Sequence, residues 1–258
     1  MTLPRRDSGA VITFDGPAAA GKSSVAQRVA RLLGMPFVSS GLLYRAATLV
    51  AARSGADPRD EAAILAALSS HAITLEPGLH ENRVRIGGHD VSAAVHTDTV
   101  DANVSFVAAH PRVRDWVSAK LREVPPPFAI DGRDMGAVVF PEARHKFFLT
   151  ASARERARRR VGERSADLEA VAGAIARRDQ LDARQSEPAP DAQHIDTEGL
   201  DLDEVVEVVL RHLAERGVVP RRAAAPGDRR ENPERGDGSA REGSAREGSV
   251  PDGDGVDA

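Results

Sequence analysis

The chain has 258 residues with 35 basic and 39 acidic side chains, and the resulting net charge of −4 argues against a protein that coats nucleic acid or a membrane surface. An aromatic content of 3% argues against a stacking platform for single-stranded nucleic acid, and the absence of cysteine excludes disulfides, thiolate zinc sites and a cysteine nucleophile. No apolar run is long enough for a transmembrane helix or a signal peptide, so the sequence predicts a cytoplasmic protein with neither nucleic acid nor membrane as a partner.

Short apolar runs alternate with helical patterns over residues 9–216, which predicts an α/β fold whose parallel sheet is covered by helices on both faces. The expected strands cover residues 10–14, 37–38, 127–130, 146–149 and 192–195. The expected helices cover residues 42–53, 171–183 and 203–216, together with one after the first strand and one that begins at Ser152.

Two of these helices carry local signals. After the first strand, four apolar side chains are expected on one face of a helix that ends at a glycine: Val25, Val29, Leu32 and Leu33. Ser152 is followed three residues later by Glu155, which predicts a capping box at the start of its helix.

Three short strands interrupt the alternation at residues 72–75, 83–86 and 89–91, separated by Pro-Gly and Gly-Gly turns. They predict a small antiparallel insert within the α/β domain. The composition changes again at Arg221, beyond which there is no Leu, Ile, Met or aromatic residue. Such a segment cannot bury enough apolar surface to offset its ordering entropy, so we expect a disordered low-complexity tail over residues 217–258.

The most informative motif runs from Gly16 to Ser23 and matches G-x-x-x-x-G-K-[ST] between an apolar strand and an apolar-faced helix. The two glycines let the backbone curl so that N–H groups point at phosphate oxygens, and the helix adds the positive end of its dipole. Lys22 can reach the β- and γ-phosphates, and Ser23 can offer a hydroxyl to Mg²⁺. The motif predicts an ATP or GTP site made of Gly16, Pro17, Ala18, Ala19, Ala20, Gly21, Lys22, Ser23 and Ser24.

The surrounding sequence favours a phosphotransferase among the classes of P-loop protein. There is no Asn-Lys-x-Asp motif to read guanine, and the chain is short for a motor. A phosphotransferase brings two anionic substrates together and therefore needs cations at the acceptor site. Arginines that could supply them recur along the chain as Arg45, Arg112, Arg114, Arg133, Arg156, Arg159, Arg160, Arg178 and Arg184.

Several blocks around these arginines resemble bacterial cytidylate kinase. The blocks are residues 15–17 with the phosphate loop, 40–45, 90–92, 107–114, 131–136 and 178–182. The resemblance implies a P-loop core that carries the antiparallel insert in a monophosphate-binding region at about residues 40–110, and a short helical lid at about residues 158–170. It implies a monomer that transfers the γ-phosphoryl group of ATP to CMP or dCMP in the presence of Mg²⁺.

The resemblance also implies roles for single residues. Lys22, Arg133, Arg156 and Arg160 would be catalytic. The substrate would be bound by Ser40, Arg45, Ser105, Arg114, Arg133, Asp134, Arg178 and Asp182. Within that set, Arg45 and Arg133 would clamp the CMP phosphate, and Ser105, Arg114 and Asp134 would read the cytosine ring. Ser23 is a Mg²⁺ ligand by its motif, and Asp131 is a second candidate by analogy with other P-loop strands that end in Asp.

Two other functions stay open from the residues: a P-loop kinase for another acceptor, such as another nucleotide or shikimate, and a non-catalytic nucleotide-binding module. Three departures from the family pattern bear on the choice. Ser39 stands where the family commonly has Asp, and His96 and Gln185 stand where it usually has Arg. We expect these departures to weaken CMP binding relative to relatives that carry all three.

Overall fold

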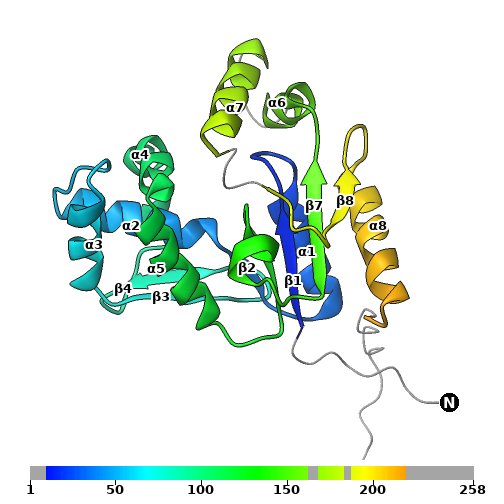
Figure 1. The fold of residues 1–258 in the computed structure, drawn as a ribbon, viewed down its shortest axis with the longest axis horizontal. Helices are drawn as coiled ribbons and strands as arrows, with labels where there is room; N and C mark the ends of the chain where they lie inside the picture. The colour runs from blue at the N-terminus through cyan, green and yellow to red at the C-terminus, as the bar shows by residue number, and fades with distance from the viewer. Residues whose placement is uncertain (1–9, 162–167, 183–186, 219–258) are drawn as a thin grey trace, which may run out of the picture. The chain divides into compact units, whose positions relative to one another are not determined.

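Five parallel strands form the central sheet of the computed structural model, which describes residues 10–161, 168–182 and 187–218. Their spatial order is β2–β6–β1–β7–β8, so the first strand of the chain lies in the middle (Figure 1). The strands are β1 (Val11–Asp15), β2 (Phe37–Ser39), β6 (Phe128–Asp131), β7 (His145–Thr150) and β8 (Gln193–Asp196). Because all five are parallel, the segments that follow β1, β6 and β7 meet at one edge of the sheet.

The sheet separates two hydrophobic cores, because its apolar strands are buried on both faces. On one face, α1 and α8 pack against Phe14 and Phe147. On the other face, α2, α4 and α5 form a core that includes Phe128 and Ile130. The helices are α1 (Lys22–Leu33), α2 (Gly41–Arg53), α3 (Glu61–Ser69), α4 (Asp98–Ala109), α5 (Pro111–Arg122), α6 (Ala153–Val161), α7 (Leu168–Asp182) and α8 (Leu202–Glu215).

A separate antiparallel sheet lies between α3 and α4 in the chain, as the turn pattern predicts. It consists of β3 (Ile73–Glu76), β4 (Arg83–Ile86) and β5 (His89–Asp90), and a 3₁₀ turn, η1 (Ala94–His96), leads from it into α4. The loop between β3 and β4 reaches the edge strand β2 of the main sheet. There Phe37 bridges to Gly78, and the Ser39 amide donates to Asn82 Oδ1 at 3.2 Å. The insert is therefore attached to the sheet next to the end of β2.

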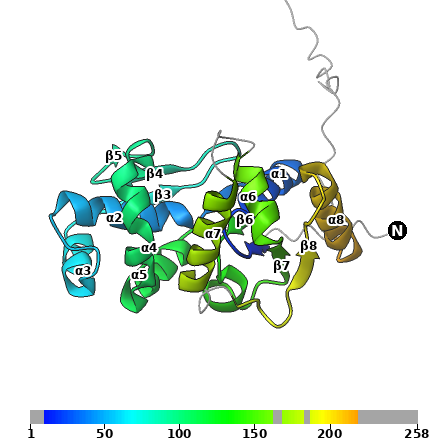
Figure 2. The same cartoon turned by 90° about the horizontal axis from the view of Figure 1, so that it is seen from above.

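Helices α6 and α7 pack against each other at the carboxyl end of β7 (Figure 1), and α7 also contacts α4 (Figure 2). The lid expected at residues 158–170 falls partly on residues 162–167, which lie outside the described residues. The same holds for Arg184, for Gln185 and for the expected tail from residue 219 onward. Helix α8 ends at Glu215, close to the predicted end of the domain, and the boundary itself stays a prediction.

Leu32 lies on the predicted apolar face of α1 by its spacing, but its side chain is 37% exposed. Val25, Val29 and Leu33 are buried as expected, and the two alanines Ala26 and Ala30 are buried with them. The alanines shift the centre of the buried face around the helix and leave Leu32 at its border. A pattern that counts only large apolar residues misses this shift, since alanine allows the close approach of α1 to the sheet.

The predicted capping box at the start of α6 is half right. The Ser152 hydroxyl accepts from the Glu155 amide at 3.1 Å, as such a box requires. However, the Ser152 amide donates to Glu198 Oε2 at 2.8 Å instead of to Glu155. A complete capping box is found on α8, where Asp201 and Glu204 each bind the backbone of the other.

Candidate functional site

The phosphate loop fills the turn between β1 and α1, and its backbone conformation explains its glycines. Gly16 has φ 139° and Gly21 has φ 84°, values that side chains rarely tolerate. A Cβ atom on Gly16 would lie 2.1 Å from the Leu149 carbonyl oxygen of β7. Ala19, with φ 61°, is the single non-glycine residue with positive φ in the part of the chain that the structure describes. The loop is thus held in a strained, curled shape against β7.

Lys22 and Ser23, at the start of α1, bind different parts of the protein. Lys22 Nζ donates to the Pro17 carbonyl at 2.6 Å, which folds the side chain back across the loop. The Ser23 hydroxyl donates to Asp131 Oδ2 at the end of β6. The loop is therefore connected to the neighbouring strand through side chains as well as through the sheet.

Two cavities flank the loop and share Lys22 and Ser23. The α6–α8 cavity has a volume of about 550 Å³ and lies between the loop, α6 and the start of α8. The α2–β6 cavity has a volume of about 250 Å³ and lies between α2, α4, α5 and the end of β6. A group bound to Lys22 and Ser23 would stand where the two cavities meet, which is the geometry needed to pass a group from one bound molecule to another.

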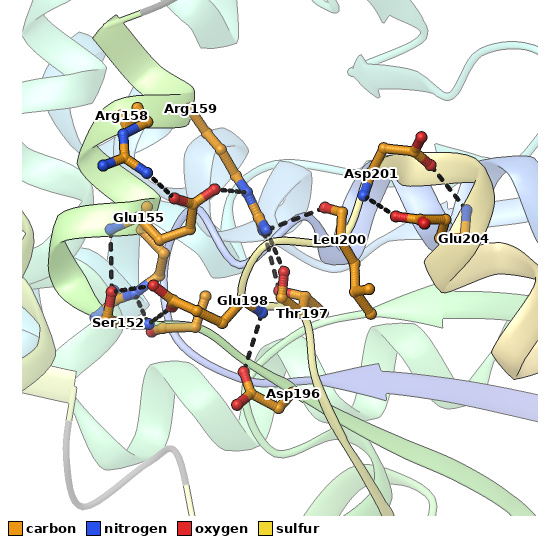
Figure 3. Close-up of polar contacts among 12 residues, drawn as sticks. Ser152, Glu155, Arg158, Arg159, Asp196, Thr197, Glu198, Leu200, Asp201 and Glu204 are labelled. Atoms are coloured by element: carbon orange, nitrogen blue, oxygen red, sulfur yellow. Dashed lines mark hydrogen bonds and ion pairs between the residues drawn. The ribbon is translucent and has the colours of Figure 1, made fainter.

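Arg159 is the best anchored cation of the α6–α8 cavity (Figure 3). Its Nη1 donates to Thr197 Oγ1 at 3.0 Å, its Nη2 donates to the Thr197 carbonyl, and its Nε donates to Glu155 at 3.3 Å. Glu198, from the same turn after β8, accepts both the amide and the hydroxyl of Ser152. Helix α6 is thus attached to this turn at two points, and these contacts fix the plane of the Arg159 guanidinium.

The predicted catalytic arginines of α6 occupy different surroundings. Arg160 is exposed and lines the α6–α8 cavity. Arg156 is buried and forms a bidentate ion pair with Asp179 of α7, with N–O distances of 3.0 and 2.5 Å. It also donates to the Ala18 carbonyl of the phosphate loop at 2.9 Å and to the Ala151 carbonyl at 3.0 Å. Arg156 therefore joins the loop, α6 and α7.

The structure brings most of the predicted substrate residues together in the α2–β6 cavity. Its lining includes Ser40, Arg45, Ser105, Arg114, Arg133 and Asp134. Arg178 and Asp182 belong to α7, and their side chains lie outside what the structure describes. Tyr44, which carried no predicted role, lines the same cavity, and burial raises its pKa to about 12.

The arginines of the α2–β6 cavity are held by acceptors of the protein. Arg45 donates to the Val95 carbonyl at 2.9 Å and to Asp101 Oδ1 at 2.6 Å. Arg133 Nη1 donates to the Gly16 carbonyl at 3.2 Å, so it reaches from the end of β6 back to the phosphate loop. These contacts keep two positive side chains at the cavity without leaving them unpaired.

Arg114 and Asp134 form an ion pair inside the cavity, between Nη2 and Oδ2. The Arg114 guanidinium also lies 5.7 Å from the centroid of the Tyr44 ring. The other oxygen of Asp134, Oδ1, is buried and accepts no hydrogen bond from any residue that the structure describes. An acceptor of this kind is suited to an amino group of a ligand, because burial without a partner is costly.

Asp131 and Ser23 fit a Mg²⁺ ion that is carried mainly by phosphates. Burial raises the pKa of Asp131, and Ser23 and Lys22 oppose the rise. Its Oδ1 is buried and accepts no hydrogen bond within the described part of the chain, so the carboxylate has an oxygen to offer. The described residues contain no cluster of three or more His, Asp or Glu that could hold a metal ion alone. Mg²⁺ usually takes only one or two protein ligands beside phosphates and water, so this donor set fits.

Asp15 is a functional candidate that the sequence reasoning left without a role. It ends β1, is buried, and accepts from the amides of Met135 at 2.8 Å and Gly136 at 2.7 Å. Burial, more than any other factor, raises its pKa to about 6, while those two hydrogen bonds lower it. A charged residue at the end of an apolar strand is the signal that could have found it, and Asp131 was singled out by that same signal.

Comparison with known proteins decides the family. The family model for cytidylate kinase matches residues 12–215, which include the loop and both cavities. The chain belongs to the cytidylate kinase family. The predicted family and the predicted α/β P-loop fold are therefore confirmed.

Curated relatives extend over the same part of the chain. A cytidylate kinase of Thermus thermophilus is 54% identical over 203 residues, which are 79% of this chain and 98% of the relative. A cytidylate kinase of Deinococcus radiodurans is 51% identical over 205 residues, which are 80% of this chain and 100% of the relative.

Among the described helices, none has the length and apolar character to cross a membrane.

Asp15 predicts a specific pH dependence of stability. Its pKa is about 6 in the folded protein against 3.8 for an ordinary Asp, so the folded state binds more protons between these values. The free energy of unfolding should therefore fall as the pH rises through this window, by about 3 kcal/mol in total. Urea unfolding of wild type and Asp15→Asn at about pH 4 and about pH 7 gives the free energy of unfolding of each protein. The change with pH in wild type minus the change in Asp15→Asn isolates Asp15, because the other titrating groups are common to both. An equal change with pH in the two proteins would contradict the prediction.

Proposed function

We propose that this chain transfers the γ-phosphoryl group of ATP to CMP or dCMP and releases ADP with CDP or dCDP. It is an ATP-dependent nucleoside monophosphate kinase of pyrimidine nucleotide metabolism. The observation that carries the proposal is that two cavities meet at Lys22 and Ser23 in a chain of the cytidylate kinase family. One cavity takes the donor and the other takes the acceptor.

ATP binds with its phosphates on residues 16–24 and its nucleoside in the α6–α8 cavity. Amide groups of the loop and the amino end of α1 stabilise the phosphate charge. Lys22 exchanges its bond to the Pro17 carbonyl for the phosphates. Ser23 and Asp131 hold Mg²⁺, which neutralises phosphate charge when it is bound.

CMP binds in the α2–β6 cavity. Arg45 and Arg133 clamp its phosphate, since a guanidinium fork matches phosphate oxygens and keeps its charge. Asp134 accepts from the exocyclic amine of cytosine through its buried Oδ1, and Arg114 donates to the ring carbonyl. Ser40 and Ser105 add hydroxyl contacts, and Arg178 with Asp182 holds the sugar. The Arg114–Asp134 ion pair orients the two base-reading groups relative to each other.

The transfer itself needs no general base. The acceptor is a phosphate whose second pKa is about 6, so it is largely a dianion at neutral pH. Catalysis then depends on placing donor and acceptor in line and on neutralising the charge that they share. Lys22 lines both cavities, Arg133 lines the α2–β6 cavity and Arg160 lines the α6–α8 cavity, so their charges surround the point of transfer. A closed site also excludes water as a competing acceptor.

Arg156 acts by positioning the loop in the described conformation. Its ion pair with Asp179 and its bond to Ala18 link α7 to the backbone that cradles the phosphates. A direct contact of Arg156 with the transferred phosphoryl group would require that Asp179 release it. The cytoplasmic location, the monomeric state and the absence of nucleic acid and membrane partners stay predictions.

An acceptor panel tests the function. Wild-type protein with Mg-ATP should release ADP with CMP and dCMP, and much more slowly with UMP, AMP, GMP or shikimate, because Asp134 and Arg114 are matched to the exocyclic amine and ring carbonyl of cytosine. Turnover with another acceptor would keep a P-loop kinase and discard the proposed base recognition. ATP binding without turnover on any acceptor would favour a non-catalytic nucleotide-binding module.

Asp134→Asn should reduce kcat/KM for CMP by about 10- to 100-fold, because it replaces a buried charged acceptor by a neutral amide. The preference for CMP over UMP should fall with it. Asp115→Asn is the matched control, since Asp115 is exposed on α5 next to Arg114 and lies outside the lining of the cavity. An unchanged CMP-to-UMP ratio in Asp134→Asn would refute the proposed role.

Arg156→Lys and Asp179→Asn should lower kcat by similar factors, on the order of tenfold, because each removes the bidentate contact between the two side chains. The double variant should be little worse than either single variant. Arg158→Lys serves as the control, since Arg158 lies on the same helix with its side chain 66% exposed. If Asp179→Asn left kcat unchanged or raised it while Arg156→Lys lowered it, Arg156 would act on the phosphoryl group directly.

A further inference from the structure

Asp15 lies between the two parts of the site without belonging to either cavity. Its carboxylate is buried directly before Gly16, where the phosphate loop begins, and it is not among the described lining residues of the two cavities. Both carboxylate oxygens are already used, one by the Met135 amide and one by the Gly136 amide. Asp15 is therefore placed to hold backbone rather than substrate.

The backbone that it holds is the turn after β6. A short π-helical segment, η2 (Met135–Val139), begins there, immediately after Arg133 and Asp134. The first amides of any helix have no acceptor within the helix and need one from elsewhere. Asp15 provides it from a position 120 and 121 residues away in the sequence.

Asp134 is the residue that would normally do this. It stands at the N-cap position of η2, where an Asp side chain usually accepts from the first amides of its own helix. In the described structure its side chain makes no capping hydrogen bond, and Oδ2 instead accepts from Arg114 in the α2–β6 cavity. Because Asp15 satisfies the amides, the Asp134 carboxylate can face the cavity.

The turn is also fixed against β1 by close packing. A Cβ atom on Gly136 would lie 2.7 Å from the Thr13 hydroxyl oxygen of β1. The Gly132 amide donates to the Phe14 carbonyl at 3.0 Å, and Arg133 reaches Gly16. The segment that carries Arg133 and Asp134 is therefore attached to β1 and the phosphate loop at several points, of which Asp15 provides the two at η2.

We propose that Asp15 is a positioning residue that caps η2 and thereby sets Arg133 and Asp134 relative to the phosphate loop. The proposal rests on the proposed function, in which these two residues bind CMP. It accounts for a buried carboxylate that contacts neither the donor nor the acceptor. A small displacement of such a segment is expected to cost much more in acceptor binding and transfer than in ATP binding, because the loop amides stay in place.

Asp15→Asn is the first test. The amide keeps the shape and one acceptor, but its NH₂ group faces a backbone amide that it cannot satisfy. We expect KM for CMP to rise by about tenfold or more and the preference for CMP over UMP to fall, while the Kd for ATP without acceptor changes by less than about twofold. Asp60→Asn is the matched control, because Asp60 caps α3 by accepting from the Ala63 amide and is not among the lining residues of either cavity. It should leave all three quantities unchanged.

The outcomes separate this proposal from the proposed function. If wild-type protein does not phosphorylate CMP, the function fails, and a crystal structure of Asp15→Asn still tests the positioning role by the place of Arg133 and Asp134. If Arg133 and Asp134 kept their positions in Asp15→Asn, the proposal would be overturned. Equal losses of ATP and CMP binding would also overturn it, as would a lower melting temperature with unchanged kinetics. Should Asp15→Asn not fold, Gly136→Ala displaces the same turn with Asp15 intact and should show the same selective loss of CMP binding.

Discussion

The close contact between the phosphate loop and β7 is the constraint on which the site depends. Gly16 leaves no room for a side chain against the Leu149 carbonyl. The loop can therefore begin this close to β7 only with a glycine at this position. Because β1 is the central strand, the turns after its neighbours β6 and β7 lie on either side of the loop. Arg133 and Asp134 follow β6, and the arginines of α6 follow β7. The strand order and this close contact together place both halves of the site around Lys22.

The cations of the site are kept in place by acidic partners. Two phosphate-bearing substrates require several arginines close together, and such a cluster would repel itself without counter-charges. Each of three arginines has a carboxylate: Arg45 with Asp101, Arg114 with Asp134, and Arg156 with Asp179. The partner of Arg45 is 55% exposed, so a phosphate can replace it, whereas Arg156 itself is 5% exposed, which suits a structural link. The counter-charges therefore hold the arginines in place whether the acidic partner is exposed, as Asp101 is, or buried, as Asp134 is.

The parts of the molecule that the sequence predicts are those encoded by neighbouring residues. The phosphate loop, the parallel sheet and the antiparallel insert depend on local patterns, and the family blocks place Arg45, Arg114 and Asp134 in one cavity. The failures involve distant partners. The expected box at Ser152 is completed by Glu198, 46 residues away, and the role of Asp15 becomes visible only when Met135 is seen beside it.

The same exchange of partners occurs at the start of two helices that border the site. At α6, Glu155 is the residue that local sequence assigns to the capping box, and Glu198 accepts the Ser152 amide in its place. At η2, Asp134 stands at the capping position, and Asp15 accepts the amides in its place. In both cases the local carboxylate binds an arginine at a cavity: Glu155 binds Arg159, and Asp134 binds Arg114. A carboxylate at or just beyond a distant strand end thus satisfies the helix, while the nearby one is engaged by an arginine that lines a cavity.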